Sequence, residues 1–145
     1  MTPGATSVGG PALERALSRV GDRWSLLVVH ALLGGPRRWS DLTAEVGGIA
    51  PNVLADRLRR LEREGVVAAE PYSDRPLRVA YRLTADGRDL AGPLLLLADW
   101  GARGGSEAPP HGACGTPLEA RWYCPTCASV VDEEPGTDPS EVLLV

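Results

Sequence analysis

The residues with the most evident chemistry lie between His111 and Cys127, a stretch that holds all three cysteines of the chain and one of its two histidines. They form two pairs of equal spacing, His111-x2-Cys114 and Cys124-x2-Cys127. A two-residue gap lets both side chains of a pair face one ion. Four nitrogen and sulfur ligands suit tetrahedral Zn(II) and leave no coordination position open. The spacing therefore predicts one structural zinc ion per chain, bound by both pairs.

Two other interpretations of these residues stay open. Residues 124–127, Cys-Pro-Thr-Cys, also have the spacing of a redox dithiol, which normally needs a helix N-terminus to lower the thiol pKa. The residues that follow, "ASVVDEEP", indicate a strand and then a loop. The third interpretation is that the cysteines bind no metal. If zinc is bound, Asp132 is an alternative to His111 as the fourth ligand.

The charge of the chain is unevenly distributed. From Pro11 to Arg103 there are 14 arginines against 12 acidic residues, a balance of +2, whereas beyond Arg103 one arginine stands against seven acidic residues, a balance of −6, which together give −4. Every basic residue of the main part is arginine, a side chain suited to bidentate contact with phosphate and guanine. The main part is therefore mildly basic, and the last residues are acidic.

The composition argues against several classes of protein. No stretch approaches the roughly 18 apolar residues of a membrane span, and the first residues, "MTPGATSVGG", do not have the pattern of a secretory signal. We expect a cytoplasmic, nucleoid-associated protein with no membrane partner. The sequence shows no Ser/His/Asp set, no phosphate-binding glycine loop and no paired carboxylates, so we expect no enzyme activity.

Short helices are predicted over the first third of the chain. Pro11 suits the first turn of a helix that ends at Gly21, and Asp22 can cap a second helix that ends at the sequence Gly34-Gly35-Pro36. Ser40 is expected to cap a third helix.

A fourth helix is predicted over residues 51–64. Its leucines at 54, 58 and 61 lie within about 60° of one another on a 3.6-residue wheel. The polar side chains expected on the opposite side are those of Asn52, Asp56, Arg59, Arg60 and Arg63.

The pattern then changes to that of strands. "VVAAEPY" and "VAYRL", separated by the turn-rich "SDRPLR", predict a β-hairpin with a polar tip. Thr84 can cap a last long helix, which Pro93 is expected to kink. Leu90, Leu94, Leu97 and Trp100 form an apolar stripe along this helix.

This order of elements predicts a mainly α fold with a β-hairpin wing, a winged helix-turn-helix, followed by a small zinc-ribbon-like knuckle. The predicted parts are a disordered N-terminus (1–10), the winged domain (11–103), a linker (104–110), the knuckle (111–131) and an acidic tail (132–145). In such folds the last helix of the three-helix unit enters the major groove, and the hairpin reaches the adjacent backbone or minor groove.

Four motifs carry a resemblance to a known family. They are "GDRWSLL" at 21–27, "GPRRW" at 35–39, "IAPNVLADRLRRLE" at 49–62 and "YRLTADG" at 81–87. In this order and spacing they resemble the HxlR-type bacterial transcription regulators, over Ala12 to Gly101. The resemblance implies a homodimer joined by the first and last helices.

The chain departs from the family pattern at two positions. Gly10 stands where members often have a cysteine, and Ala50 stands where a serine usually caps the recognition helix.

We therefore predict a sequence-specific transcription regulator that binds double-stranded DNA, at a pseudo-palindromic operator, through helix 51–64 and wing 72–80. Of the arginines at 57, 59, 60 and 63, at least two should contact DNA, and base contacts should fall to Asn52, Val53 and Asp56. The expected contact residues are Arg37, Arg38, Ser40, Asn52, Val53, Asp56, Arg57, Arg60, Arg63, Arg75 and Arg78.

Two alternatives to this function follow from the end of the chain. One is a protein-interaction module that uses the knuckle and the acidic tail. The other is a thiol-disulfide redox protein.

Overall fold

The structure is a computed structural model that describes residues 10–102 and 108–131. The chain divides into two compact units between Leu97 and Ala98, inside the last helix. The predicted linker falls largely, and the predicted acidic tail entirely, outside the described residues. The same holds for residues 1–9 of the predicted disordered N-terminus, whereas Gly10 begins a helix.

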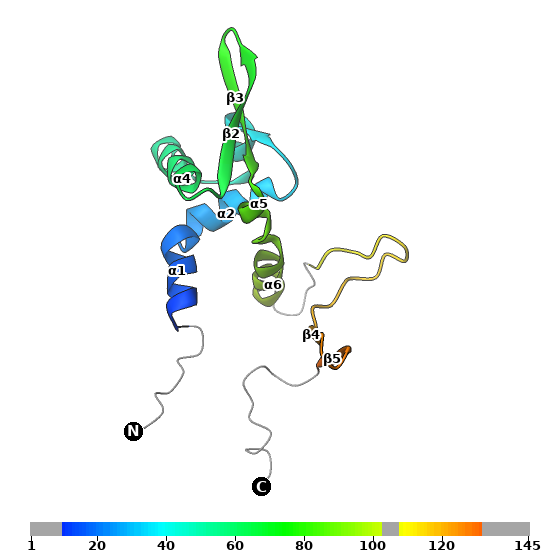
Figure 1. The fold of residues 1–145 in the computed structure, drawn as a ribbon. Coiled ribbons are helices and arrows are strands. Elements are labelled where there is room, and N and C mark those ends of the chain that lie inside the picture. Colours follow the sequence, from blue (N-terminus) through cyan, green and yellow to red (C-terminus); the bar gives the residue numbers. More distant parts are fainter. Residues whose placement is uncertain (1–9, 103–107, 132–145) are drawn as a thin grey trace, which may run out of the picture. The chain divides into compact units, whose positions relative to one another are not determined.

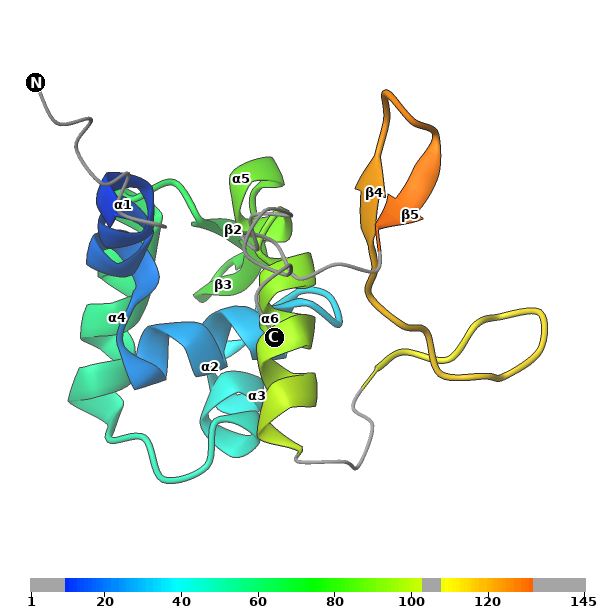
Figure 2. The ribbon, with the colours of Figure 1, turned by 90° about the horizontal axis from the view of Figure 1, so that it is seen from below.

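The elements up to Gly101 follow the predicted order (Figure 1), except that a short strand, β1, is added and the last helix is divided in two. They are α1 (Gly10–Val20), α2 (Arg23–Leu32), β1 (Arg37–Arg38), α3 (Trp39–Glu45), α4 (Pro51–Arg63), β2 (Val67–Asp74), β3 (Leu77–Leu83), α5 (Ala85–Arg88) and α6 (Ala91–Gly101). Figure 2 shows α2 between α1 and α6. In Figure 1 the β2–β3 hairpin extends upward, whereas α1 and α6 extend in the opposite direction.

The core forms where the apolar stripes of α2, α3 and α4 meet. The three leucines at the predicted spacing, Leu54, Leu58 and Leu61, are all buried. They belong to one cluster with Val28 and Leu42, among others. A helix of 13 residues gains most of its stability from burying such a stripe rather than from intrinsic propensity. This packing fixes the orientation of α4 and therefore decides which of its side chains face solvent.

The predicted hairpin is present and is longer than expected. The sheet has the order β1-β3-β2, with antiparallel pairing throughout. A register shift lies between Pro71 and Ser73 of the edge strand β2. Proline is tolerated there because an edge strand and a bulge both spare its missing N–H from the ladder. The hairpin extends from the helices, and Arg75 and Pro76 form its turn (Figure 1).

Two of the three predicted helix caps are correct. The Asp22 carboxylate accepts the Ser25 N–H at 3.1 Å, and the Thr84 hydroxyl accepts the Gly87 N–H at 3.1 Å. The prediction for Ser40 is wrong, because α3 begins at Trp39 and its N-cap is Arg38, two residues before Ser40. Asp41 provides the stabilising contact, since its carboxylate accepts the Arg38 N–H at 3.0 Å.

The long helix predicted after Thr84 is two helices. α5 ends at Arg88 and α6 begins at Ala91, so Pro93 lies in the first turn of α6 instead of kinking a continuous helix. Proline lacks an N–H and its ring clashes with the carbonyl four residues earlier, which here belongs to Asp89. The break falls where that clash would occur.

The second unit contains two short antiparallel strands, β4 (Trp122–Cys124) and β5 (Ser129–Val131). An isolated bridge joins Pro110 and Pro117 upstream of them. Cys127 is thus followed by a strand, as its sequence predicted.

None of the helices in the described part of the chain is both long and apolar enough to span a membrane.

Candidate nucleic-acid interface

One face of α4 is exposed along its whole length. Asn52, Asp56, Arg59 and Arg63 are all exposed, and their spacing of four, three and four residues places them within about 60° on the helical wheel. The buried leucines occupy the opposite side. Neither Arg59 nor Arg63 forms an ion pair with any described residue. The face therefore presents two arginines whose charge no carboxylate of the described chain neutralises.

The side chains of two other arginines of α4 point toward α1 and the start of α2 rather than into solvent. Arg57 donates from Nε to Asp22 at 2.8 Å and also pairs with Asp56. Arg60 donates to the Ser18 carbonyl and lies 3.7 Å from the Asp22 carboxylate. The prediction of an outward-facing Arg60 is wrong, because its position lies on the flank of α4 that packs beside α1 and α2.

Asp22 is the centre of this contact between helices. Partial burial alone would raise its pKa, but hydrogen bonds from the Ser25 hydroxyl, the Ser25 amide and Arg57 lower the pKa below its usual value of 3.8. The carboxylate thus caps α2 and binds two arginines in the same place. Because α4 is tethered through it, Asp22 helps to set the orientation of the exposed face.

We expect Asp22→Ala to destabilise the fold by about 2 kcal/mol, from loss of a helix cap and of a hydrogen bond to a charged group. Urea unfolding monitored by circular dichroism measures this change. Asp74→Ala removes a carboxylate that forms no ion pair in the described chain and should change stability by less than about 0.5 kcal/mol. Equal effects of both substitutions would contradict the role of Asp22.

The lowered pKa of Asp22 gives this contribution a defined pH dependence. A carboxylate whose folded pKa is depressed stabilises the fold above its usual pKa, and the stabilisation is lost as the pH falls through the folded value. Asp22→Asn should therefore be less stable than the parent at pH 7, with a difference that shrinks below about pH 4.

The two arginines before α3, both expected to contact DNA, belong to a strand. Arg37 and Arg38 constitute β1, which pairs with Tyr81 and Ala80 of β3. Arg37 forms an ion pair with Glu45 at 2.8 Å, so its charge is already compensated. The Arg38 guanidinium lies 4.7 Å from the centre of the Tyr72 ring and has no carboxylate partner in the described chain. Of the two, Arg38 is the better candidate for contact with phosphate.

The hairpin carries a second basic group. Arg75 lies in its turn and Arg78 near the start of β3; both are exposed, and neither pairs with a carboxylate of the described residues. These two residues match the predicted wing contacts in position. The free arginines of α4 and of the hairpin thus lie on separate elements, as contact with a groove and with adjacent backbone requires.

The start of α4 lacks a side-chain cap, as the alanine at position 50 predicted. Ala50 is the N-cap, Pro51 occupies the first turn, and no side chain accepts a hydrogen bond there. The first amides of a helix bind phosphate readily. Asn52 is exposed beside them, whereas Val53 is half-buried against the core and is less available to a base than predicted.

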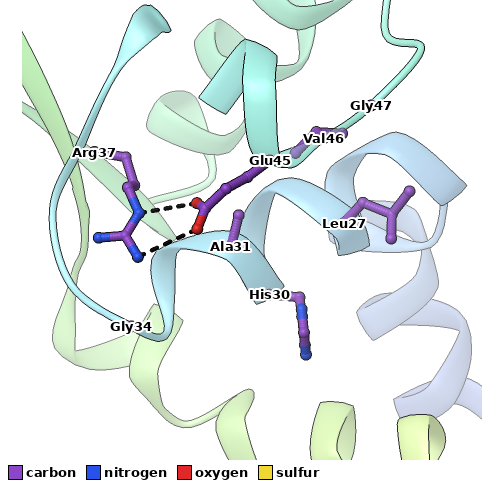
Figure 3. A pocket seen from close by; sticks show the side chains of 8 residues that line it. All are labelled: Leu27, His30, Ala31, Gly34, Arg37, Glu45, Val46 and Gly47. Carbon is purple, nitrogen blue, oxygen red and sulfur yellow. Dashed lines mark hydrogen bonds and ion pairs between the residues drawn. The ribbon is translucent and has the colours of Figure 1, made fainter. Parts of the chain in front are cut away.

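A pocket of about 450 Å³ lies between α2 and the end of α3 (Figure 3). The Arg37–Glu45 ion pair forms part of its wall, and His30 is exposed at its rim. Sequence analysis did not identify this pocket, because it depends on how two helices pack rather than on any local pattern. Ser40, the remaining predicted contact residue, is exposed on α3.

The predicted metal ligands of the second unit form two separate pairs. His111 Nδ1 lies 3.3 Å from Cys114 Sγ. Hydrogen bonds from the Thr116 hydroxyl, the Thr116 amide and His111 to the sulfur lower the pKa of Cys114 to about 7. Hydrogen bonds from the amides of Cys127 and Thr126 likewise lower the pKa of Cys124. Within 10–102 and 108–131, no three metal-binding side chains come together.

Comparison with known proteins places this arrangement in a family. The transcriptional regulator Rv3095 of Mycobacterium tuberculosis is 38% identical over 138 residues, which cover 88% of this chain and 87% of that protein. YodB of Bacillus subtilis is 33% identical over 90 residues, covering 62% of this chain and 80% of that protein.

Solved structures agree with the sequence relatives. The oxidised form of the redox regulator HypR superposes with a TM-score of 0.61 at 28% identity, covering 66% of this chain and 98% of that one. The model of the HxlR-like helix-turn-helix family matches residues 19–108, which include the whole of α2 to α6. With the motifs, the fold and these relatives in agreement, the chain belongs to the HxlR-like helix-turn-helix family.

Proposed function

We propose that the protein is a sequence-specific regulator of transcription that binds double-stranded DNA as a homodimer. In this proposal α4 enters the major groove, and the β2–β3 hairpin contacts the neighbouring backbone or minor groove. The observation that supports it best is the exposed face of α4, where Arg59 and Arg63 have no acidic partner in the described chain. The buried leucines fix the orientation of α4, so these two guanidinium groups face solvent and are available to bind phosphate.

The direction of recognition follows from the positions along α4. Asn52 and Asp56 lie toward its N-terminal end, where a recognition helix reads base edges. An amide can read adenine and a carboxylate can accept from cytosine. Arg59 and Arg63 lie farther along the same face, where phosphate contacts would fix affinity and register.

Assembly as a dimer is supported by apolar side chains that the described chain leaves exposed. Leu13 and Leu17 of α1 are 55% and 51% exposed, and Leu97 of α6 is 51% exposed. Leucines at i and i+4 lie on one helical face. A two-fold dimer would bind two half-sites about 34–36 Å apart, or a multiple of this, at a pseudo-palindromic operator.

The salt dependence of DNA affinity tests the function. If Arg59, Arg63, Arg75 and Arg78 each neutralise one phosphate, a dimer makes eight such contacts and the plot of log affinity against log salt has a slope of about −7. Fluorescence anisotropy between about 50 and 200 mM salt measures it, with a duplex selected from random sequences by the protein itself.

A matched duplex of scrambled sequence is the control for specificity. It should bind with a similar slope but more weakly. A slope near zero for both duplexes would show that phosphate contacts do not contribute, and would favour the alternative of a protein-interaction module. Equal affinity for both would overturn sequence-specific recognition.

A further inference from the structure

The first pair of predicted metal ligands lies in a tight turn. The bridge between Pro110 and Pro117 closes it, and the Gly115 N–H donates to the His111 carbonyl at 2.7 Å. The turn brings the His111 ring and the Cys114 sulfur to the same side, 3.3 Å apart. Gly115, directly after the cysteine, has a φ of 72°, in the left-handed region.

The second pair lies in a turn of the same design. Cys124 ends β4 and pairs with Ser129 of β5, so Cys127 lies within a four-residue connection closed by strand pairing. Ala128, directly after the second cysteine, has a φ of 51°.

The repetition of this backbone is informative because of Ala128. Among the described residues it is the only one other than glycine with a positive φ, a conformation that a Cβ disfavours. Because alanine has a β-carbon and still adopts this conformation, the turn rather than the residue type sets the backbone of Ala128. Each turn therefore has the same order along the chain: a predicted metal ligand, two further residues, a cysteine, and a residue with a left-handed backbone conformation.

The described residues from 108 to 131 form no core that could hold these turns in place. No residue from 108 to 131 is buried. The large apolar side chains of this stretch are exposed, namely those of Leu118, Trp122, Tyr123 and Val130. Units too small to bury a core are usually stabilised by disulfides or a metal, and the cysteines of this unit are free.

We propose that the two turns close around one zinc ion, bound by His111, Cys114, Cys124 and Cys127. Each turn already presents two ligands, and the ion would join the two pairs. The separation within the first pair supports this, because Zn–S near 2.3 Å and Zn–N near 2.0–2.1 Å at a tetrahedral angle place sulfur and nitrogen about 3.5 Å apart. With four protein ligands the site is structural rather than catalytic.

The strand after the second turn favours zinc over a redox dithiol at Cys124 and Cys127. A dithiol of this spacing is activated by a helix N-terminus, whereas here a strand follows the turn.

Metal content of the full-length protein tests the proposal. After purification under reducing conditions without chelator, elemental analysis should give about one zinc per chain. Removal of zinc and addition of Co²⁺ should produce the visible absorption of tetrahedral cobalt together with sulfur-to-cobalt charge transfer. Cys124→Ser should lose at least tenfold in affinity for Co²⁺, as should Cys114→Ser and Cys127→Ser.

The two histidines of the chain provide a matched pair for the fourth ligand. His111→Ala should weaken Co²⁺ binding and alter its spectrum, whereas His30→Ala, on α2, should leave both unchanged. Zinc-free protein with three reactive thiols, or with a Cys124–Cys127 disulfide, would overturn the proposal. One ion per two chains would also overturn it, because the site would then lie between subunits.

This test is separate from the test of DNA binding. All four ligands belong to the second unit, whereas the proposed DNA contacts belong to the first. Circular dichroism of the zinc-free protein should therefore retain the helical signal. A protein that binds no zinc but retains the steep salt dependence of DNA affinity would fail this proposal alone.

Discussion

Replacing both Arg59 and Arg63 with alanine should weaken DNA binding about 100- to 1000-fold at physiological salt, for the selected and the scrambled duplex alike. A dimer would lose four phosphate contacts, at about 0.9 in the salt slope for each. The slope should therefore become shallower by about 3 to 4. The discrimination between the two duplexes should change little, because phosphate contacts set affinity while base contacts set sequence. Anisotropy titrations at several salt concentrations measure both quantities.

The same helix provides a control with an identical change in charge. Arg57→Ala combined with Arg60→Ala also removes two positive charges per subunit from α4, but both side chains contact Asp22 within the protein. This variant should lose folding stability and keep most of the salt slope, with a change below about 1. If it lowers the slope as much as the Arg59/Arg63 variant does, the exposed face of α4 is not the DNA-binding face.

The contrast between these two pairs shows what the sequence alone leaves undecided. The helical period correctly predicted the buried leucines and the side of α4 opposite to them, because both depend on spacing within one helix. Arg60 lies between those sides on the wheel. Its direction depends on Asp22 and Ser18, which are distant in sequence and become neighbours only when α1 and α2 pack against α4.

Local signals also predicted most of the fold. Asp22 and Thr84 were identified as caps because a short polar side chain before an apolar pattern can accept the first free amides of a helix. The hairpin followed from a change of period and a turn rich in polar residues. These predictions needed only a few neighbouring residues, and the winged helix-turn-helix fold is confirmed by the relatives of known structure.

The missed features depend on contacts between distant segments. β1 has two residues, too few for a period, and exists because Arg37 and Arg38 pair with β3. α3 begins at Trp39, directly after β1, so that Arg38 rather than Ser40 is its N-cap. A kink in one long helix was predicted at Pro93, whereas the chain forms two helices and Pro93 lies in the first turn of the second, a position that proline tolerates.

Converting Leu13 and Leu17 to aspartate should turn a dimer into a monomer. Both side chains are about half exposed in the described chain and lie on one face of α1. In the proposed dimer a second copy covers this apolar face. A dimer would have to bury four unpaired carboxylates. If each costs even about 1 kcal/mol, the dissociation constant rises about 1000-fold. Analytical ultracentrifugation at micromolar concentration should give a mass near twice the 15.3 kDa of one chain for the parent, and one chain mass for the variant.

Leu77→Asp makes the same chemical change at another exposed leucine and serves as the control. Leu77 is 70% exposed and lies next to the turn of the hairpin, on an element that the proposed dimer does not use. This variant should stay dimeric. Because the operator has two half-sites, the monomeric Leu13/Leu17 variant should also lose the gain from binding both at once, although α4 and the hairpin are untouched. A parent protein that is monomeric at micromolar concentration, or a Leu13/Leu17 variant that remains dimeric, would show that α1 does not join the subunits.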